Sequence, residues 1–373
     1  MPDKNKIGYR PTWAEVNLKN LEYNFKKIKS LLRPQTRILV TVKADAYGHG
    51  LIPVSRRLAA NGVDFLGVAS IDEGIKLRKA GIKTPILVLG LIFKKDIQPL
   101  FSYNLIPTVC DEKFAFALNA RAAILNKPIR LHIKVDTGMG RIGVAYDDAF
   151  GLVKKIHKLK FIVIDGIFTH FPFADINRKF TVFQINLFNK LAGDLKKSGI
   201  VIPLVHAANS IGLIDYLDSH FTMVRPGLVI YGLYPKKGLG INLKPVLSLK
   251  TRVVFIKQVP AGYGISYGHA YITSRPARII TLPIGYGDGY PRNLSNLASV
   301  LIGGRRRRVS GRVCMDQIMV DVGSQKPKIG DEVVLIGKQG KQKITVEELA
   351  RLSGTIPYEI VCGLGSRIPR IYK

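Results

Sequence analysis

The feature of this sequence that most restricts its fold is a regular alternation between residues 36 and 232. Short runs rich in β-branched residues alternate with stretches, such as 71–81 and 180–199, that have a helical spacing of apolar residues and end on glycine. This alternation is typical of parallel sheets with a helix between successive strands. We expect strands at 37–42, 64–69, 85–90, 105–110, 130–135, 163–170, 203–209 and 221–226. Eight strand–helix units in about 200 residues predict an α/β TIM barrel of eight parallel strands.

The pattern changes after Lys244. Strands separated by Gly and Pro turns follow, and the clearest helical pattern among them is VEELARLSG at 346–354. A chain of 373 residues is long enough to form two domains. We therefore predict a (β/α)8 barrel over 11–240 and a mostly β C-terminal domain over 241–373, with residues 1–10 packing against the C-terminal domain.

Positive charge is the least ordinary property of the composition. The chain has 57 Lys and Arg residues against 26 Asp and Glu residues, a formal net charge of +31. Such an excess, with a run of four arginines from Arg305 to Arg308, could indicate an anionic partner such as nucleic acid. The lysines, however, are spread along the whole chain, and the arginine run follows a Gly303-Gly304 turn. We therefore interpret the arginines as a solvated hairpin and expect no specific nucleic-acid binding.

Membrane and metal signals are weak. The longest apolar runs, such as 85–93, have about half of the length that a membrane-spanning helix needs, and no apolar run follows the basic first residues. We therefore expect a cytoplasmic protein that does not contact a membrane. Cys110, Cys314 and Cys362 lack metal-ligand spacing, and the histidines form no HExxH pair, so we expect free thiols and no bound metal.

Polar residues follow directly after the expected barrel strands, at the end where barrel enzymes hold their active sites. Lys43 closes the first strand. A desolvated lysine there can form an imine with a carbonyl, although a salt-bridged structural lysine is the commoner case. Phosphate sites in barrels form after the last two strands, where Ser210 offers a hydroxyl and Gly227 an approachable backbone. An amine and a phosphate cup at two sides of one mouth suit pyridoxal 5'-phosphate (PLP).

A second phosphate-binding pattern lies in the fifth strand–helix unit. Residues 138–143 read GMGRIG, which matches the GxGxxG dinucleotide pattern, and Asp165 follows at a suitable distance. No clear helix follows this match, and its surroundings do not predict a doubly wound sheet. We therefore favour PLP over NAD.

Nine motifs in this sequence resemble, in the same order, those of alanine racemases, and the resemblance covers nearly the whole chain. The most specific is VKADAYGHG at 42–50, which is similar to the PLP-lysine signature of that family. The others are HIKVDTGMGRIG at 132–143, THF at 169–171, HAANS at 206–210, VRPGLVIYG at 224–232, GYGISYG at 262–268, PIGYGDGY at 283–290, GRVCMDQ at 311–317 and IPYEIVCGLGSRIPR at 356–370.

The resemblance implies an amino-acid racemase in which two residues move protons. Lys43 would hold PLP as a Schiff base and act as the base on one face of the substrate. Tyr267 would act on the opposite face, from the partner subunit of a head-to-tail homodimer. Further cofactor contacts would come from Tyr47, Asn209, Ser210, Gly227, Leu228 and Tyr358, most of them to the phosphate.

The resemblance also implies the residues around the cofactor ring. Arg225 would face the pyridine nitrogen, and Arg141 would lie near the phenolic oxygen and the substrate carboxylate. His170 would bridge Tyr267 and Arg225. Lys134 matches a lysine that is often carbamylated in this family.

The substrate entrance would combine residues of both subunits. Met315 would complete the carboxylate site across the interface, and Tyr286 with Tyr358 would narrow the entrance. Three positions depart from the family pattern: Asp45 stands where asparagine is more usual, and Gly287 and Tyr290 replace the usual alanine and tryptophan beside the entrance tyrosine.

These residue types suit racemisation of alanine, which would supply D-alanine for peptidoglycan. Moving a proton from one face of Cα to the other requires a base on each side, and a lysine and a tyrosine supply them. Arg225 can only donate hydrogen bonds to the pyridine nitrogen, which weakens the electron sink and disfavours side reactions. The alternatives are a broad-specificity racemase of the same fold, a fold-related decarboxylase, which usually has a carboxylate in place of Arg225, and a non-catalytic PLP-binding protein.

Overall fold

A computed structural model describes residues 9–373, and most of the segment 1–10 that we expected to pack against the C-terminal domain lies outside this range. All eight expected barrel strands are confirmed, parallel and in the order β10-β2-β3-β4-β5-β6-β8-β9. Backbone hydrogen bonds from Thr222 N to Val205 O (3.1 Å) and from Arg225 N to Ala208 O (2.9 Å) join the last two strands and nearly close the barrel. These strands are β2 (Arg37–Thr41), β3 (Phe65–Val68), β4 (Ile86–Val88), β5 (Ile106–Val109), β6 (Ile129–Asp136), β8 (Ile162–Phe168), β9 (Leu204–His206) and β10 (Met223–Val224), and a short β7 (Val144–Ala145) pairs with β6.

Helices surround the barrel, and their apolar stripes face the strands. Several begin where the side chain of the preceding residue accepts a backbone hydrogen bond, as Ser70, Asp111 and Asn177 do for α5, α7 and α9. The barrel helices are α2 (Leu18–Lys29), α4 (Leu51–Ala60), α5 (Ile71–Lys79), α6 (Gln98–Ser102), α7 (Glu112–Ile124), α8 (Tyr146–His157), α9 (Arg178–Lys197) and α10 (Ser210–Asp215). The segment labelled α3 (Lys43–Gly48) is different, because its backbone is left-handed.

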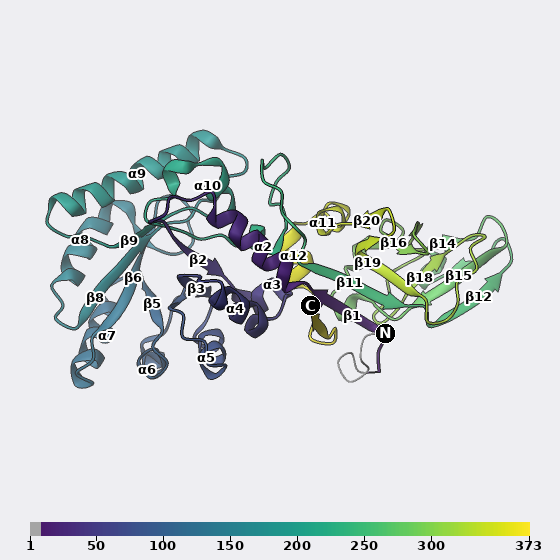
Figure 1. The fold of residues 1–373 in the computed structure, drawn as a ribbon, viewed down its shortest axis with the longest axis horizontal. Coiled ribbons are helices and arrows are strands. Elements are labelled where there is room, and N and C mark those ends of the chain that lie inside the picture. The colour runs from purple at the N-terminus through teal and green to yellow at the C-terminus, as the bar shows by residue number, and fades with distance from the viewer. Residues whose placement is uncertain (1–8) are drawn as a thin grey trace.

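The C-terminal domain is mostly β, as predicted, and lies at the opposite end of an elongated molecule (Figure 1). Its largest sheet has the order β17-β16-β19-β11-β1-β21, and a second sheet has the order β12-β15-β18. The strands are β1 (Thr12–Val16), β11 (Leu247–Arg252), β12 (Phe255–Val259), β13 (Gly264–Ile265), β14 (Tyr271–Ile272), β15 (Ala277–Leu282), β16 (Ser299–Ile302), β17 (Arg305–Arg308), β18 (Ile318–Asp321), β19 (Glu332–Gln339), β20 (Gln342–Ile344) and β21 (Arg370–Tyr372).

Two features differ from the sequence-based expectation. β1 pairs with β11 and β21, so residues 12–16 belong to the C-terminal sheet although the expected barrel began at residue 11. The reason is that β1 is buried on both faces and pairs with a strand on each side, β11 and β21, which both belong to the C-terminal domain. The expected helix at 346–354 is confirmed as α11 (Val346–Ser353), but a second helix, α12 (Pro357–Cys362), follows and packs against α3 where the two domains meet.

The arginine run belongs to a hairpin, as expected, and its four arginines form one complete strand of it, β17. β17 pairs with β16 in antiparallel register through the two-residue turn Gly303-Gly304, and both glycines have positive φ values of 54° and 71°. Within residues 9–373, helices long and apolar enough to cross a membrane are absent.

Candidate active site

Lys43 begins a left-handed turn directly after β2. The residues Ala44–Tyr47 all have φ between 52° and 54°, a conformation that costs an L-residue roughly 1–2 kcal/mol each. Side chains from several segments hold the turn: Glu73 accepts a hydrogen bond from its first amide (2.7 Å), and Asp45 accepts one from the amide that begins α4 (2.7 Å). His49 contacts the last carbonyl of the turn through Nδ1 (2.7 Å). The turn thereby fixes the direction of both Lys43 and Tyr47.

The amine of Lys43 lies in a half-buried position at the mouth of the barrel. Burial, followed by the positive charge of Arg141, lowers the pKa of Lys43, while Glu73 and Cys362 act against this shift. A lower pKa increases the fraction of neutral amine, which is the form that attacks a carbonyl or accepts a proton.

A small polar cup lies beside this turn. Ser210 Oγ accepts a hydrogen bond from Gly227 N (3.0 Å), and a Cβ placed on Gly227 would lie 2.8 Å from the Tyr47 hydroxyl oxygen. Tyr358 packs edge-on against Tyr47, with ring centroids 5.6 Å apart. Asn209 caps α10 by accepting hydrogen bonds from two of its amides, which fixes Ser210 at the helix start. Of the residues predicted to hold phosphate, the structure brings together Tyr47, Ser210, Gly227, Leu228 and Tyr358.

Arg225 begins a buried chain of hydrogen-bonding groups that runs down the barrel. Its Nη1 contacts His206 Nδ1 (2.9 Å), and its Nη2 donates to the carbonyl of Thr169 (2.7 Å). Because arginine can only donate, His206 Nδ1 is the acceptor and His206 carries its proton on Nε2. His206 Nε2 in turn donates to His132 Nδ1 (2.9 Å), which places the proton of His132 on Nε2, 3.6 Å from Asp165.

Positive charges gather around His170 at the barrel mouth. Burial, and then the charges of Arg225, Lys134, Arg141 and Lys43, lower the pKa of His170 well below its ordinary value. His170 Nδ1 lies 3.5 Å from Arg225 Nη2, so the expected pairing of these two residues is a long contact. Lys134 is 2% exposed and its Nζ lies 4.7 Å from the centre of the Phe168 ring; burial, and then Arg225 and Arg141, hold its pKa well below the ordinary value.

Arg141 projects from the glycine-rich loop after β6. Asp136 accepts hydrogen bonds from the amides of Gly138, Met139 and Gly140 at 2.8–2.9 Å. The amides of the segment that matched the dinucleotide pattern are therefore bound by the nearby Asp136, and the segment presents the exposed Arg141.

Tyr267, Tyr286 and Met315 lie in the C-terminal domain, where the two tyrosines each begin a short 3-10 helix and Met315 lies in a bend. Their exposed fractions are 69%, 42% and 54%, which is high for large side chains with an apolar body. Ser266, Tyr267, Cys314, Met315, Asp316 and Gln317 line a surface hollow of about 510 Å³. The predicted site residues therefore fall into two groups, one around Lys43 at the barrel mouth and one around the hollow that Tyr267 lines.

Four residues near the site were not predicted from the sequence. Glu73 lies on α5 and also accepts a hydrogen bond from Ala69 N (2.7 Å), which ties the loop after β3 to the lysine turn. His132, His206 and Asp165 complete the chain below Arg225. The sequence contains one indication for the two histidines. His132 and His206 fall inside motifs quoted above, at positions of barrel strands that alternate inward.

The barrel mouth fits PLP on its own geometry. The cup offers a hydroxyl and backbone amides at a glycine where a Cβ would fill the space, which suits a phosphate. The lysine with a lowered pKa suits an aldehyde carbon, and the cations around His170 suit an anionic ligand.

Comparison with known proteins gives the same family throughout the chain. Residues 16–235 match the family described as "Alanine racemase, N-terminal domain", and residues 246–372 match "Alanine racemase, C-terminal domain". The alanine racemase of Halothermothrix orenii is 50% identical over 99% of this chain and 98% of its own length. That of Carboxydothermus hydrogenoformans is 45% identical over 97% of this chain and 100% of its own. The solved structure of alanine racemase from Clostridium difficile superposes with a TM-score of 0.92 at 38% identity, covering 97% of this chain and 96% of that one.

Proposed function

This chain belongs to the alanine racemase family, and we propose that it interconverts L-alanine and D-alanine with PLP held at Lys43. The observation that carries the proposal is the barrel mouth, where one lysine with a lowered pKa, a small polar cup and a buried arginine lie together. D-alanine produced in the cytoplasm would serve peptidoglycan synthesis.

The residues of the mouth would hold PLP at three points. Lys43 would bind the aldehyde carbon of PLP, and Arg225 would contact its ring nitrogen. The phosphate would lie in the cup formed by Tyr47, Ser210, Gly227, Leu228 and Tyr358. When bound, PLP draws electrons away from Cα of the amino acid and makes the Cα proton acidic. Arg225 keeps its charge near neutral pH, because burial lowers its pKa only to about 9. It would therefore donate a hydrogen bond to the ring nitrogen without protonating it, which would limit the electron sink and favour simple return of the proton.

Two residues would exchange the Cα proton. Lys43 would act on one face, because its lowered pKa makes a neutral amine available. Tyr267 would act on the other face, and because it lies exposed on the C-terminal domain it would enter the site of a partner subunit. The site would then form only in a head-to-tail homodimer, in which Met315 and Tyr286 also reach the partner's barrel mouth.

The substrate carboxylate would lie between Arg141 and Met315. A carbamate on Lys134 would balance the charge of Arg141, and formation of a carbamate requires a neutral amine, which the lowered pKa of Lys134 favours. The alternative, a broad-specificity racemase, would share the cofactor residues and differ at the entrance near Tyr286. The full-length matches to alanine racemases favour alanine.

The first prediction tests the cofactor site and the substrate together. PLP-loaded protein should racemise L-alanine far faster than other L-amino acids, as measured by chiral analysis of each product. Borohydride reduction followed by peptide mapping should find PLP on Lys43. Lys43→Ala should abolish both attachment and racemisation, because a nucleophilic amine is lost.

The matched control is Lys19→Ala, which removes an exposed lysine on α2. Reduced PLP on any other lysine would overturn the site assignment. Equal rates on larger amino acids would favour the broad-specificity alternative.

A further inference from the structure

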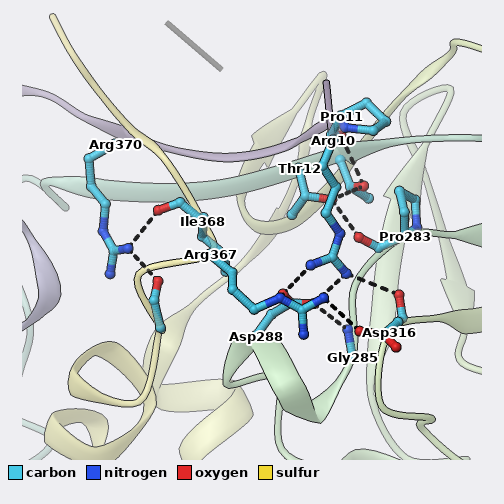
Figure 2. Close-up of polar contacts among 12 residues, drawn as sticks. Arg10, Pro11, Thr12, Pro283, Gly285, Asp288, Asp316, Arg367, Ile368 and Arg370 are labelled. Atoms are coloured by element: carbon cyan, nitrogen blue, oxygen red, sulfur yellow. Dashed lines mark hydrogen bonds and ion pairs between the residues drawn. The ribbon is translucent and has the colours of Figure 1, made fainter. Parts of the chain in front are cut away.

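Four charged residues form one connected cluster (Figure 2), and two of them, Asp288 and Asp316, closely follow Tyr286 and Met315 in the sequence. We call this cluster the clamp; it consists of Arg10, Asp288, Asp316 and Arg367. Arg10 pairs with Asp288 through both ends of its guanidinium, and its Nη2 lies 2.7 Å from Asp288 Oδ2. Arg367 Nη2 donates to Asp316 Oδ1 (2.7 Å), and its Nε lies 3.5 Å from Asp288 Oδ1.

Asp288 is the centre of the clamp. Its side chain is 0% exposed, and it also accepts a hydrogen bond from Gly285 N (3.0 Å). A carboxylate removed from water in this way is stable only when cations and donors surround it. Arg10 and Arg367 come from segments next to β1 and β21, which are neighbours in the large sheet, so the two ends of the described chain hold one loop.

The clamp joins two loops into one unit. Tyr286 N donates to Cys314 O (3.0 Å), and Gly287 N donates to Met315 O (2.9 Å). Arg10 Nη2 also donates to the carbonyl of Asp316 (3.1 Å), and so bridges both loops with one guanidinium. Because each loop is fixed to the other, the backbone positions from which Tyr286 and Met315 project have a set separation.

Gly287 makes room for one arm of the clamp. A Cβ on Gly287 would lie 2.7 Å from Arg367 Nη1 and 3.1 Å from Met315 O. Among the described residues Gly287 is not one of those with positive φ, so the backbone itself permits alanine, which is more usual in this family. The space at Gly287 is therefore occupied by Arg367, and a methyl group there would compete with the arginine.

We propose that the clamp sets substrate selectivity, with Arg367 and Gly287 acting as positioning residues for Tyr286 and Met315. This inference rests on the proposed function, in which these two side chains complete the partner's site. A firm clamp holds Tyr286 in the entrance and Met315 at the carboxylate, and the site accepts little more than the methyl side chain of alanine. The segment of Tyr267 has an anchor outside the clamp, since Ser266 Oγ donates to the carbonyl of Arg312 (2.8 Å). A loosened clamp therefore widens the entrance and leaves Lys43 and Tyr267 in place.

The experiment compares Arg367→Ala, Arg367→Lys and Gly287→Ala with wild type, each as PLP-loaded dimer on L-alanine and on L-serine. We expect Arg367→Ala to raise the KM for alanine about tenfold with little change in kcat. The ratio of kcat/KM for serine over alanine should rise about tenfold, the scale on which one extra group in a pocket is discriminated. Arg367→Lys should restore part of both values, because it keeps the charge but not the two-pronged contact.

Gly287→Ala should raise the KM for alanine and the serine-to-alanine ratio of kcat/KM by smaller factors, because its methyl group displaces Arg367. In the double variant Gly287→Ala/Arg367→Ala, the methyl group should add nothing, since the arginine that it displaces is already gone. Arg308→Ala, which removes an exposed arginine of β17, is the control for lost surface charge.

The outcomes separate this inference from the proposed function. A wild-type protein that does not racemise alanine overturns the proposed function. If wild type racemises alanine and the single variants keep its KM and its serine-to-alanine ratio while their melting temperatures fall, the clamp is only structural and the inference fails. Additive effects of Gly287→Ala and Arg367→Ala would also overturn it, because the methyl group would then act by another route.

Discussion

His49 shows at the residue scale how burial decides protonation. Its Nδ1 donates to the carbonyl of Tyr47, its ring packs on Tyr231 with centroids 4.5 Å apart, and the residue is 0% exposed. Burial, with a smaller contribution from Arg370, lowers the pKa of His49 to about 4, although its hydrogen bonds to backbone carbonyls act against this. The folded protein therefore keeps His49 neutral at pH values where the unfolded chain binds a proton there.

The second prediction is a loss of stability in acid that depends on His49. Below the unfolded pKa of about 6.5 the unfolded state binds the extra proton, so the free energy of unfolding falls as pH falls, by about 3 kcal/mol at pH 4 from this residue. His49→Leu should lower stability at pH 7 by about 1–3 kcal/mol through lost hydrogen bonds, and should reduce the slope of stability between pH 6.5 and pH 4.

Urea unfolding at several pH values measures both effects. The exposed His157 provides the matched control, His157→Leu. An unchanged slope in His49→Leu would show that other groups carry the acid sensitivity.

The residue scale also shows where prediction from the sequence succeeds and stops. The common location of Lys43, Ser210 and Gly227 could be predicted because each follows a barrel strand, and strand ends meet at one mouth. Their roles toward a cofactor stay a prediction. The hydrogen bonds from Arg225 through His206 to His132 could not be predicted. They depend on which inward-facing residues of β6 and β9 reach one another inside the barrel. The clamp could not be predicted from the sequence either. Arg10 reaches Asp288 because β1 pairs with β11, and this pairing joins segments that are far apart in the sequence.

At the element scale, the turn Ala44–Tyr47 is the least ordinary segment of the backbone. Four successive residues other than glycine in the left-handed region are strained, and hydrogen bonds to Glu73, Asp45 and His49 compensate for the strain. Asp45, where asparagine is more usual, takes part by accepting a hydrogen bond from the first amide of α4. The turn therefore belongs to the site, because it directs Lys43 and Tyr47.

The third prediction concerns the effect on stability of replacing alanine by glycine, which differs between left-handed and right-handed backbone. Ala44 is exposed and has φ of 52°, so Ala44→Gly should leave stability unchanged or raise it by up to about 1 kcal/mol through relief of strain. Ala59, in the right-handed helix α4, provides the matched control, and Ala59→Gly should lower stability by about 1 kcal/mol. Thermal and urea unfolding of both variants measure the difference. A loss of stability in Ala44→Gly as large as in the control would contradict the argument from strain.

The barrel could be predicted from the sequence at this scale, while single elements of the C-terminal domain could not. Each barrel strand and helix has its own local pattern, and short connections place neighbours in order. β1 looks like the start of a barrel but pairs with β11, more than 200 residues away in sequence. α12 has only six residues and is stabilised by packing against α3, which no local pattern records.

At the scale of the whole molecule, the net charge of +31 leads to the fourth prediction. Two of the four arginines of β17 are already engaged in the molecule, Arg306 with Glu348 and Arg307 with Gln325. We therefore expect only weak, sequence-independent attraction to duplex DNA, which falls steeply as salt rises. A salt titration by fluorescence anisotropy measures it. Submicromolar affinity at physiological salt would show that a dedicated nucleic-acid surface exists.

The fifth prediction concerns the separation of the two groups of site residues over one elongated chain. Lys43 lies at the barrel mouth, whereas Tyr267 belongs to the C-terminal domain and is 69% exposed, and the proposed two-base site would therefore need two subunits. Tyr267→Phe removes one acid–base group and leaves Lys43 and the phosphate cup intact. Deuterium exchange at Cα should persist from the enantiomer that Lys43 deprotonates, expected to be D-alanine, and should fall for L-alanine by about a hundredfold to ten-thousandfold.

Mixing the two inactive variants tests the shared site directly. A hybrid dimer of Lys43→Ala and Tyr267→Phe subunits contains one site in which both defects meet and one in which Lys43 and Tyr267 are both intact. Activity should therefore return after subunit exchange, to about a quarter of the wild-type value if mixing is random, because half of the dimers are hybrids and each has one working site. Subunit exchange is confirmed independently by mass spectrometry of differently tagged chains. If hybrids form and remain inactive, and exchange falls equally for both enantiomers, Tyr267 does not complete the partner's site and the two-base model must be abandoned.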